Sequence, residues 1–126
     1  SSMPADNSVM LASTAGGISV VSILAAAPTN STVVQASPGQ VYGFSVVNTS
    51  AAYQFLKIFN ASTAVQISTA AHIMTKGMPP QTAYDYQFNF GIPCSTGIYA
   101  AVTGQISKAD NTAIAVSTSA ITIYYK

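Results

Sequence analysis

The stretch AYDYQFNFGIP, residues 83–93, places an aromatic ring at every second position. The four rings belong to Tyr84, Tyr86, Phe88 and Phe90, and the residues between them are Asp85, Gln87 and Asn89. Successive side chains of a β-strand point to opposite faces, so this alternation predicts a half-buried strand with the four rings packed on one face. The polar side chains are then directed away. Phe88 and Phe90 favour the core, whereas the hydroxyl groups of Tyr84 and Tyr86 need partners and fit nearer a rim.

Two interpretations of these rings remain open. Core packing is the simpler one, because four rings that bury about 150 Å² each would anchor a large share of a small core. The alternative is an aromatic platform, either for stacking on sugar rings or for contact with a neighbouring subunit. Tyrosine is enriched where a surface is partly dry and partly wet.

The rest of the chain continues the two-residue period from Ile18 onward. Short runs rich in β-branched and aromatic residues end at Pro, Gly, Asn or Ser, as strands do. They are ISVVSIL (18–24), STVVQ (31–35), QVYGFSVVN (40–48), AYQFLKIFN (52–60), TAVQIST (63–69), HIMTK (72–76), AYDYQFNF (83–90), GIYAAVTG (97–104) and AVSTSAITIYYK (115–126). The sequence therefore predicts an all-β chain with a single antiparallel β-sandwich, jelly-roll-like and of about eight strands, over residues 18–126. Residues 1–17, small and polar, are expected to form an extended N-terminal arm.

One segment allows two predictions. Residues 61–74, ASTAVQISTAAHIM, contain enough alanine for one or two turns of helix, but their many β-branched residues disfavour a helix. A strand at 63–69 is the preferred prediction.

The strand at 52–60 has two mostly apolar faces. One side carries Gln54, Leu56 and Ile58, and the other carries Tyr53, Phe55, Lys57 and Phe59. Since neither face suits water, the second is expected to be covered by something other than the strand's own core, and a neighbouring protein would serve. The last strand behaves similarly and runs to the final residue, which predicts that the C-terminus is tied into a sheet.

Charged side chains are rare. Only 6% of the residues are charged and the net charge is +1, against about 25% charged residues in ordinary domains. Four scattered lysines cannot form the basic patch that nucleic-acid binding requires. The longest apolar run, ISVVSILAAAP (18–28), is too short to cross a bilayer. Little hydration free energy is lost when another protein covers a neutral polar surface. The composition therefore indicates permanent assembly.

Groups suited to catalysis are few. His72 is the single histidine and Cys94 the single cysteine, and with Asp110 they would act together only within hydrogen-bond reach of one another. Cys94 is better explained as a small buried hydrophobe. Zinc sites need several His or Cys ligands, and glycosidases need two facing carboxylates. The sequence predicts no enzyme, no metal site and no cofactor.

Short motifs follow one another in the second half of the chain. They are Lys57 in the middle of a strand, a hydrophobic stretch, a Ser-Thr-Gly-Ile turn (95–98), a strand that ends in Thr103 and Gly104, an acidic-Asn-Thr loop (110–112), and a final strand that closes on Ile-Tyr-Tyr-Lys (123–126). Over residues 40–126 this pattern resembles a group of small bacteriophage virion proteins. The segment AAHIMTKGMPP (70–80) and the first 40 residues depart from the pattern.

The resemblance implies a multimeric β-sandwich that does structural work without catalysis. It implies a location on the capsid surface of a virion, where the protein decorates or cements the shell at junctions between major capsid subunits. Its partners would be the major capsid protein and itself, as a homotrimer or another cyclic oligomer, with neither nucleic acid nor membrane. The alternatives are a tail or fibre component and a glycan-binding attachment module.

Tyrosines dominate the residues that we expect at a binding surface. The candidate interface consists of Tyr53, Phe55, Tyr84, Tyr86 and Tyr124. In the glycan alternative, the rings that would stack on sugars are Tyr42, Tyr53, Tyr84, Tyr99 and Tyr124.

Overall fold

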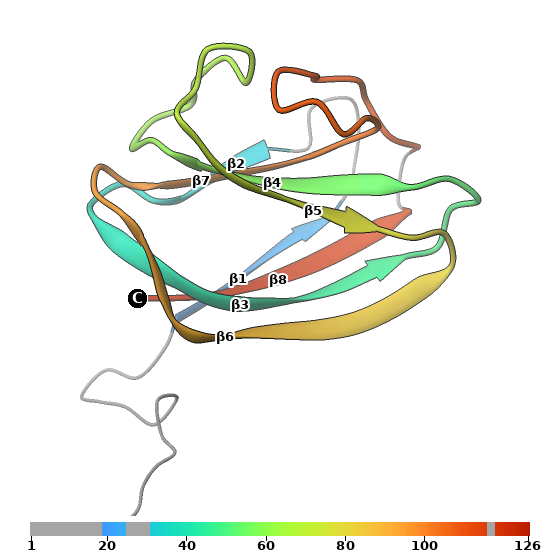
Figure 1. Cartoon of the computed structure of the whole chain (residues 1–126), viewed down its shortest axis with the longest axis horizontal. Helices are drawn as coiled ribbons and strands as arrows, with labels where there is room; N and C mark the ends of the chain where they lie inside the picture. Colours follow the sequence, from blue (N-terminus) through green and yellow to red (C-terminus); the bar gives the residue numbers. More distant parts are fainter. Residues whose placement is uncertain (1–18, 25–30, 116–117) are drawn as a thin grey trace, which may run out of the picture.

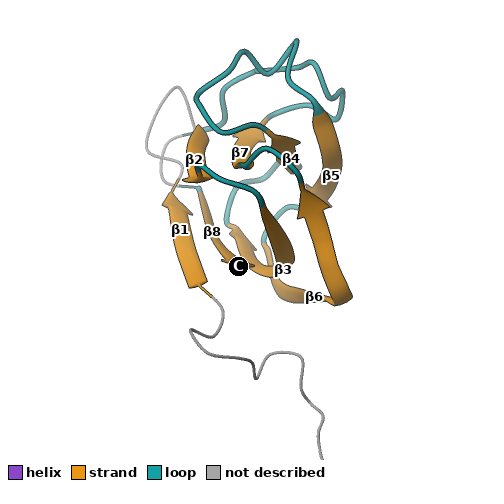
Figure 2. Cartoon of the chain, turned by 90° about the vertical axis from the view of Figure 1, so that its left-hand side faces the viewer, coloured by secondary structure: helices purple, strands orange, loops and turns teal. Residues whose placement is uncertain are grey.

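The chain folds into two antiparallel β-sheets of four strands each, stacked face to face (Figures 1 and 2). The computed structural model describes residues 19–24, 31–115 and 118–126, the first of these ranges by its backbone alone. The arm expected at residues 1–17 lies outside the described residues. Within them the strands are β1 (Ser19–Leu24), β2 (Ser31–Gln35), β3 (Gly39–Asn48), β4 (Gln54–Asn60), β5 (His72–Met78), β6 (Thr82–Cys94), β7 (Ile98–Thr103) and β8 (Ser119–Tyr125).

Each sheet joins strands that are distant in the sequence. The lower sheet of Figure 1 has the order β1-β8-β3-β6, and the upper sheet has the order β2-β7-β4-β5. All six pairs are antiparallel: β1–β8, β3–β8 and β3–β6 in the lower sheet, and β2–β7, β4–β7 and β4–β5 in the upper sheet. The predicted all-β fold of antiparallel sheets is confirmed. No helix long and apolar enough to span a membrane occurs in the described part of the chain.

The space between the sheets holds the main core. Its fully buried members alternate along their strands with residues of the outer faces, as the two-residue period predicts. The largest are Val41, Phe44, Val46, Leu56, Ile58, Met78, Ile98, Ile121 and Ile123. Each fully buried side chain of this size contributes about 1.5–3 kcal/mol, so this layer supplies most of the driving force for stacking the sheets.

The outer face of the upper sheet is buried as well. A second cluster there consists of Phe59, Ala61, Tyr99 and Ala101. Side chains from the loop between β4 and β5 pack against this cluster, among them Val65, Ile67 and Ala70. The two apolar faces predicted for β4 are therefore confirmed. At Phe59 the chain's own loop provides the second cover, so no neighbouring protein is needed there, whereas Phe55 on the same face stays partly exposed.

The loop at residues 61–71 corrects another prediction. Neither the strand expected at 63–69 nor the helix considered for 61–74 forms, and β5 begins only at His72. The backbone N–H and the hydroxyl of Thr69 donate to the carbonyl of Gln66 at 3.0 and 3.3 Å, which closes a turn. The apolar residues that produced the two-residue period cap the upper sheet instead, because burial against it outweighs local propensity.

Lys57 lies within this second buried layer and has no exposed surface. Its ammonium group donates to the carbonyls of Ser107 and Asp110, the second at 2.8 Å, in the loop between β7 and β8. The residues opposite Lys57 on the neighbouring strands are Ala101 and Thr75, whose small side chains leave room for the lysine stem. Burial lowers the pKa of the ammonium group, and the negative charge of Asp110 opposes this shift. Lys57 thus fastens the second loop over the upper sheet.

Two asparagines fasten the ends of their strands. The buried amide of Asn48, at the end of β3, donates to the carbonyl of Met78 at 2.8 Å. The amide oxygen of Asn60, at the end of β4, accepts from the backbone N–H groups of Thr96 and Gly97 at 2.7 and 3.2 Å. A Cβ at Gly97 would lie 2.6 Å from a backbone oxygen, so the close approach requires glycine. Each asparagine replaces missing backbone partners at a strand end.

The C-terminus is part of the lower sheet. The backbone N–H of Lys126 donates to the carbonyl of Gln40 at 2.9 Å, and the N–H of Gln40 donates to the carbonyl of Lys126 at 2.8 Å. These bonds continue the ladder between β8 and β3 to the last residue. The predicted attachment of the C-terminus is confirmed.

Lys57→Ala is expected to lower the free energy of unfolding by about 2–4 kcal/mol, because it removes both hydrogen bonds to the loop and leaves a cavity beneath it. Urea unfolding followed by circular dichroism measures the loss. Lys108→Ala is the matched control, since Lys108 is an exposed lysine of the same loop, and it should cost less than about 0.5 kcal/mol. Equal losses in the two variants would contradict the role of Lys57.

The buried ammonium group also makes stability depend on pH. The pKa of Lys57 is lower in the folded chain than its ordinary value of 10.5, so the folded chain binds fewer protons than the unfolded chain between these two values. The free energy of unfolding should therefore rise as the pH rises through that interval, and Lys57→Met should lack this rise. Urea unfolding of both proteins at pH values from about 8 to 10.5 measures the difference between their free energies of unfolding. The tyrosines are the same in both proteins, so their protonation changes cancel in this difference. A constant or falling difference would refute the prediction.

Candidate functional site

Four of the five residues expected at an interface lie together around strand β5. Tyr53 directly precedes β4, Phe55 lies near the start of β4, and Tyr84 and Tyr86 are on β6. Strands β5 and β6 are edge strands of the upper and lower sheets, and they lie on the same side of the molecule (Figures 1 and 2). The four side chains therefore surround one open edge of the two-layer fold.

Above β5, two stacked rings cover a glycine. The ring centroids of Tyr53 and Phe55 are 6.0 Å apart and their planes differ by 18°. Gly77 lies opposite Phe55 in the pairing of β4 with β5. A Cβ at Gly77 would lie 3.6 Å from the Phe55 ring and 3.9 Å from the Tyr53 ring, so both rings lie against bare backbone. Aromatic cover of a glycine on an edge strand is a known way to stabilise such an edge.

Below β5, Tyr84 and Lys76 connect the two sheets. The Tyr84 hydroxyl donates to the carbonyl of Gly77 at 2.9 Å, and burial raises the pKa of this hydroxyl, which keeps it protonated. The Nζ atom of Lys76 lies 4.6 Å from the centre of the Tyr86 ring and 5.5 Å from that of Tyr84. Contacts of this cation–π type contribute about 0.5–1 kcal/mol at exposed sites. Lys76 was not among the residues predicted for the interface. The only signal in the sequence was its spacing of two residues from Met74, which packs against the core, because residues two apart face the same side of a strand.

The rings of β6 do not share one environment. Tyr84 and Phe88 pack against the core, whereas the Tyr86 side chain is 42% exposed. Tyr86 keeps ring contacts with Phe44 and Phe88 at centroid distances of 5.7 and 5.2 Å. It therefore lies at the rim of the core, as its hydroxyl group predicted.

Phe90 is the exception to the predicted alternation. It was expected in the core, but 70% of its side chain is exposed. Residues 88–91 of β6 stand against a single residue of β3 at a break in the pairing of these strands. An irregularity of this kind bends an edge strand and turns side chains out of the regular alternation. The prediction that all four rings pack on the core is wrong for this reason.

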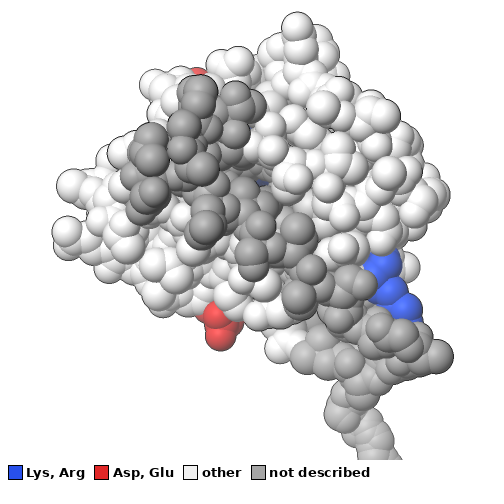
Figure 3. Space-filling model, turned by 180° about the vertical axis from the view of Figure 1, so that it is seen from behind, with Lys and Arg blue, Asp and Glu red and all other residues white. Residues whose placement is uncertain are grey.

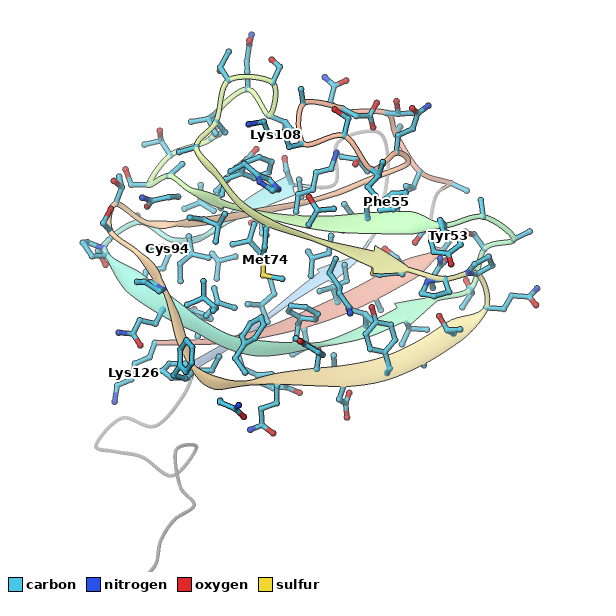
Figure 4. All side chains as sticks on the ribbon, in the orientation of Figure 1. Tyr53, Phe55, Met74, Cys94, Lys108 and Lys126 are labelled. Atoms are coloured by element: carbon cyan, nitrogen blue, oxygen red, sulfur yellow. The ribbon has the colours of Figure 1, made fainter. Side chains whose placement is uncertain are left out.

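We name Tyr53, Phe55, Lys76, Tyr84 and Tyr86 the edge surface. Figure 4 shows Tyr53 and Phe55 at the end of the molecule opposite Lys126. The edge surface offers rings, phenolic hydroxyls and one cation, but none of its members forms a nucleophile and base pair. Aromatic residues at a partly exposed position are the residue types that dominate binding energy when a partner excludes water. The arrangement is suited to binding.

Tyr124 lies apart from the edge surface. It belongs to the outer face of the lower sheet, where its hydroxyl is 2.9 Å from the hydroxyl of Ser45. The polar residues Asp85, Gln87 and Asn89 of β6 are exposed as predicted, and the pairing with β3 places the first two on this face. Figure 3, the view from behind, shows that charged side chains are sparse on the described surface. Tyr124 thus fastens β8 to β3 and is not gathered with the other candidates.

The fold does not bring together the groups considered for catalysis. Cys94 is 1% exposed in the core between the sheets. His72 lies on the outer face of the upper sheet, where its ring contacts Phe59 edge-on at 5.7 Å and its Nε2 is 2.7 Å from the hydroxyl of Thr75. The carboxylate of Asp110 accepts hydrogen bonds within its own loop. Among the described residues, no group of three His, Cys, Asp or Glu side chains is placed to hold a metal ion.

Comparisons with protein-family models, with curated proteins and with solved structures found no match to this chain.

Cys94 should react with a water-soluble aromatic disulfide at least about tenfold more slowly in the folded chain than in urea, because only an accessible thiolate attacks a disulfide. Burial removes access to this thiol and raises its pKa. Absorbance of the released thiolate at about pH 8 measures both rates, and Cys94→Ala should release none. Similar rates in the folded and unfolded chain would show that Cys94 is accessible.

Proposed function

We propose that this protein is a structural component of a virion that decorates or cements a bacteriophage capsid at junctions between major capsid subunits. It would act on the capsid surface as a homotrimer or another cyclic oligomer. The observation that carries the proposal is the edge surface, where rings and one lysine lie partly exposed on an almost uncharged molecule. Surfaces of this composition are stabilised when another protein excludes water from them.

The order of the strands supports the finer description of the fold as a jelly roll. Two four-stranded sheets with the orders β1-β8-β3-β6 and β2-β7-β4-β5 fit that topology. Jelly rolls recur in viral capsid proteins and in lectins, both of which are proteins that bind through their surfaces. Fold alone does not establish function, so this point supports the proposal only as an analogy.

We also propose that residues 1–17 form an extended arm that reaches a neighbouring subunit. They precede β1, which is an edge strand of the lower sheet. An extended segment that adds to the edge of a sheet in another subunit is a common mode of attachment.

The motifs that resemble virion proteins have structural tasks in this fold. Lys57 holds the loop that contains Asp110, and Asn60 holds the turn at 95–98. Lys126 completes the ladder between β8 and β3. Each motif thus fastens one part of the chain to another, which fits the structural work that the resemblance implies.

The proposed mechanism is burial of the edge surface against other subunits. Apolar area removed from water contributes about 25 cal/mol per Å², and the Tyr53 and Tyr86 side chains are 53% and 42% exposed. A stable interface covers about 800 Å² on each partner, which is more than these two rings can supply. The edge surface would therefore be the centre of a larger contact that the cyclic symmetry of the oligomer repeats.

Two alternatives use the same surface differently. A tail or fibre component would bury the same rings in a small number of copies. A glycan-binding attachment module would use Tyr53, whose exposed ring is held by Phe55. In that case a sugar ring would stack on the tyrosine face.

The amount of this chain in purified virus particles is the decisive measurement. A capsid decoration protein should occur at a fixed ratio to the major capsid protein, with about as many copies as there are junctions in the shell. Quantitative mass spectrometry of purified particles gives this ratio. A handful of copies that separate with the tails would contradict capsid decoration and favour a tail or fibre component.

Matched variants of the same strand then test the edge surface. Tyr86→Ser should weaken rebinding to capsids stripped of this protein by more than about tenfold, as loss of a central ring does. Gln87→Ser is the control, because Gln87 is the next residue and is exposed on the opposite face of β6. Both variants should retain cooperative unfolding. Rebinding of Tyr86→Ser at the wild-type level would show that the edge surface is not the contact.

A further inference from the structure

A groove of about 340 Å³ lies on the upper sheet, away from the edge surface. Its walls come from the loop between β4 and β5 and the loop between β7 and β8, which rise from the top of the molecule in Figure 1. Its floor comes from β7, including Tyr99 and Ala101. The groove and the edge surface share no residue. A ligand in the groove therefore need not contact the edge surface.

The groove combines an apolar base with neutral polar groups. Val65 and Ile67 line one wall beside Tyr99, and none of the described residues that line the groove is charged. Small-molecule sites have this composition, with volumes of about 300–1,000 Å³ and a few polar groups that fix orientation. Phosphates and carboxylates need cations or helix N-termini for recognition, and this lining provides neither. The composition favours an uncharged ligand that has both apolar and hydroxyl-bearing faces.

Three polar side chains at the groove have no part in holding the described chain together. Gln66, Ser68 and Asn111 line the groove and are exposed. Their side chains form no hydrogen bond within residues 31–115 and 118–126. In contrast, the Tyr99 hydroxyl lies 2.9 Å from that of Ser31, so this ring is held in place. Two amides and one hydroxyl remain to bind a ligand.

Both walls are held before any ligand binds. Lys57 fastens the wall that contains Asn111 through the carbonyls of Ser107 and Asp110. The turn at Gln66, closed by Thr69, fixes the other wall. A preformed site binds more tightly because less conformational entropy is lost on binding.

We propose that this groove binds a neutral saccharide, which gives the protein an attachment function in addition to its assembly role. The C–H face of a sugar ring would lie against Val65 and Ile67. Its hydroxyl groups would exchange hydrogen bonds with Gln66, Ser68 and Asn111, since amides both donate and accept. This site is distinct from the stacking site on Tyr53.

An NMR titration of the full-length chain labelled with ¹⁵N tests the saccharide site. The probes are the methyl glycosides of glucose, galactose, mannose and N-acetylglucosamine, each added separately. We expect at least one of them to cause saturable shifts of the amide signals of residues 65–68 and 111. Asn111→Ala should weaken that binding by roughly tenfold, because a hydrogen bond to the sugar is lost.

Asn89→Ala is the matched control, because Asn89 is also an exposed asparagine but lies on the lower sheet. It should bind the sugar as the wild type does, and Gln66→Ala provides a second groove variant if Asn111→Ala fails to fold. Tyr86→Ser should keep sugar binding even where it loses capsid binding. The proposal is overturned if no probe shifts these signals. It is overturned equally if the shifts cluster at Tyr53 and Tyr86.

Discussion

Both faces of strand β4 are largely covered by the rest of the chain, and only Phe55 and Asn60 stay partly exposed. One face supplies Leu56 and Ile58 to the core between the sheets, and the other presents Lys57 and Phe59 to two loops. A lysine in this position needs oxygen ligands, because an ammonium group without partners is costly in a dry layer. The carbonyls of the loop between β7 and β8 meet that need. The covered outer face of the upper sheet, and the groove between the loops, both follow from this burial.

The loops that cover the upper sheet limit which parts of the molecule are available to partners. The part of the outer face of β4 around Lys57 and Phe59 is not available, so an assembly would use other parts of the fold. One of these is the edge where β5 and β6 end the sheets, with Lys76 close to the rings of Tyr84 and Tyr86. Edge strands present unpaired backbone groups and invite pairing with other chains. The break in pairing at residues 88–91 bends part of β6. Tyr84 and Tyr86, which precede the break, lie in the regular pairing with β3. The edge is thus shaped for side-chain contact more than for continuous strand addition.

The low charge of the chain has different consequences at the two surfaces. At the edge surface it allows close approach of another protein, because few ions must lose their hydration. At the groove, the described lining residues are uncharged, so amides and hydroxyls would be the groups that recognise the proposed saccharide. Both surfaces depend on loops and strand ends that are held by buried polar groups, notably Lys57 and Asn48. The hydrogen bonds of these few buried polar side chains therefore help to shape both surfaces.

The sequence by itself predicted the eight strands of the described residues, together with a ninth at 63–69 that does not form. It also predicted the two apolar faces of β4, because a two-residue period is a local property that each strand carries alone. It also indicated the rim position of Tyr86 and four of the five members of the edge surface. Only the tertiary structure decided what covers β4, since the segment at 61–71 has a strand-like period and becomes a cap through contacts with Phe59. The exposure of Phe90 and the place of Lys76 were likewise decided by pairing between distant strands. Such pairing depends on register and loop path, which no local pattern of residues encodes.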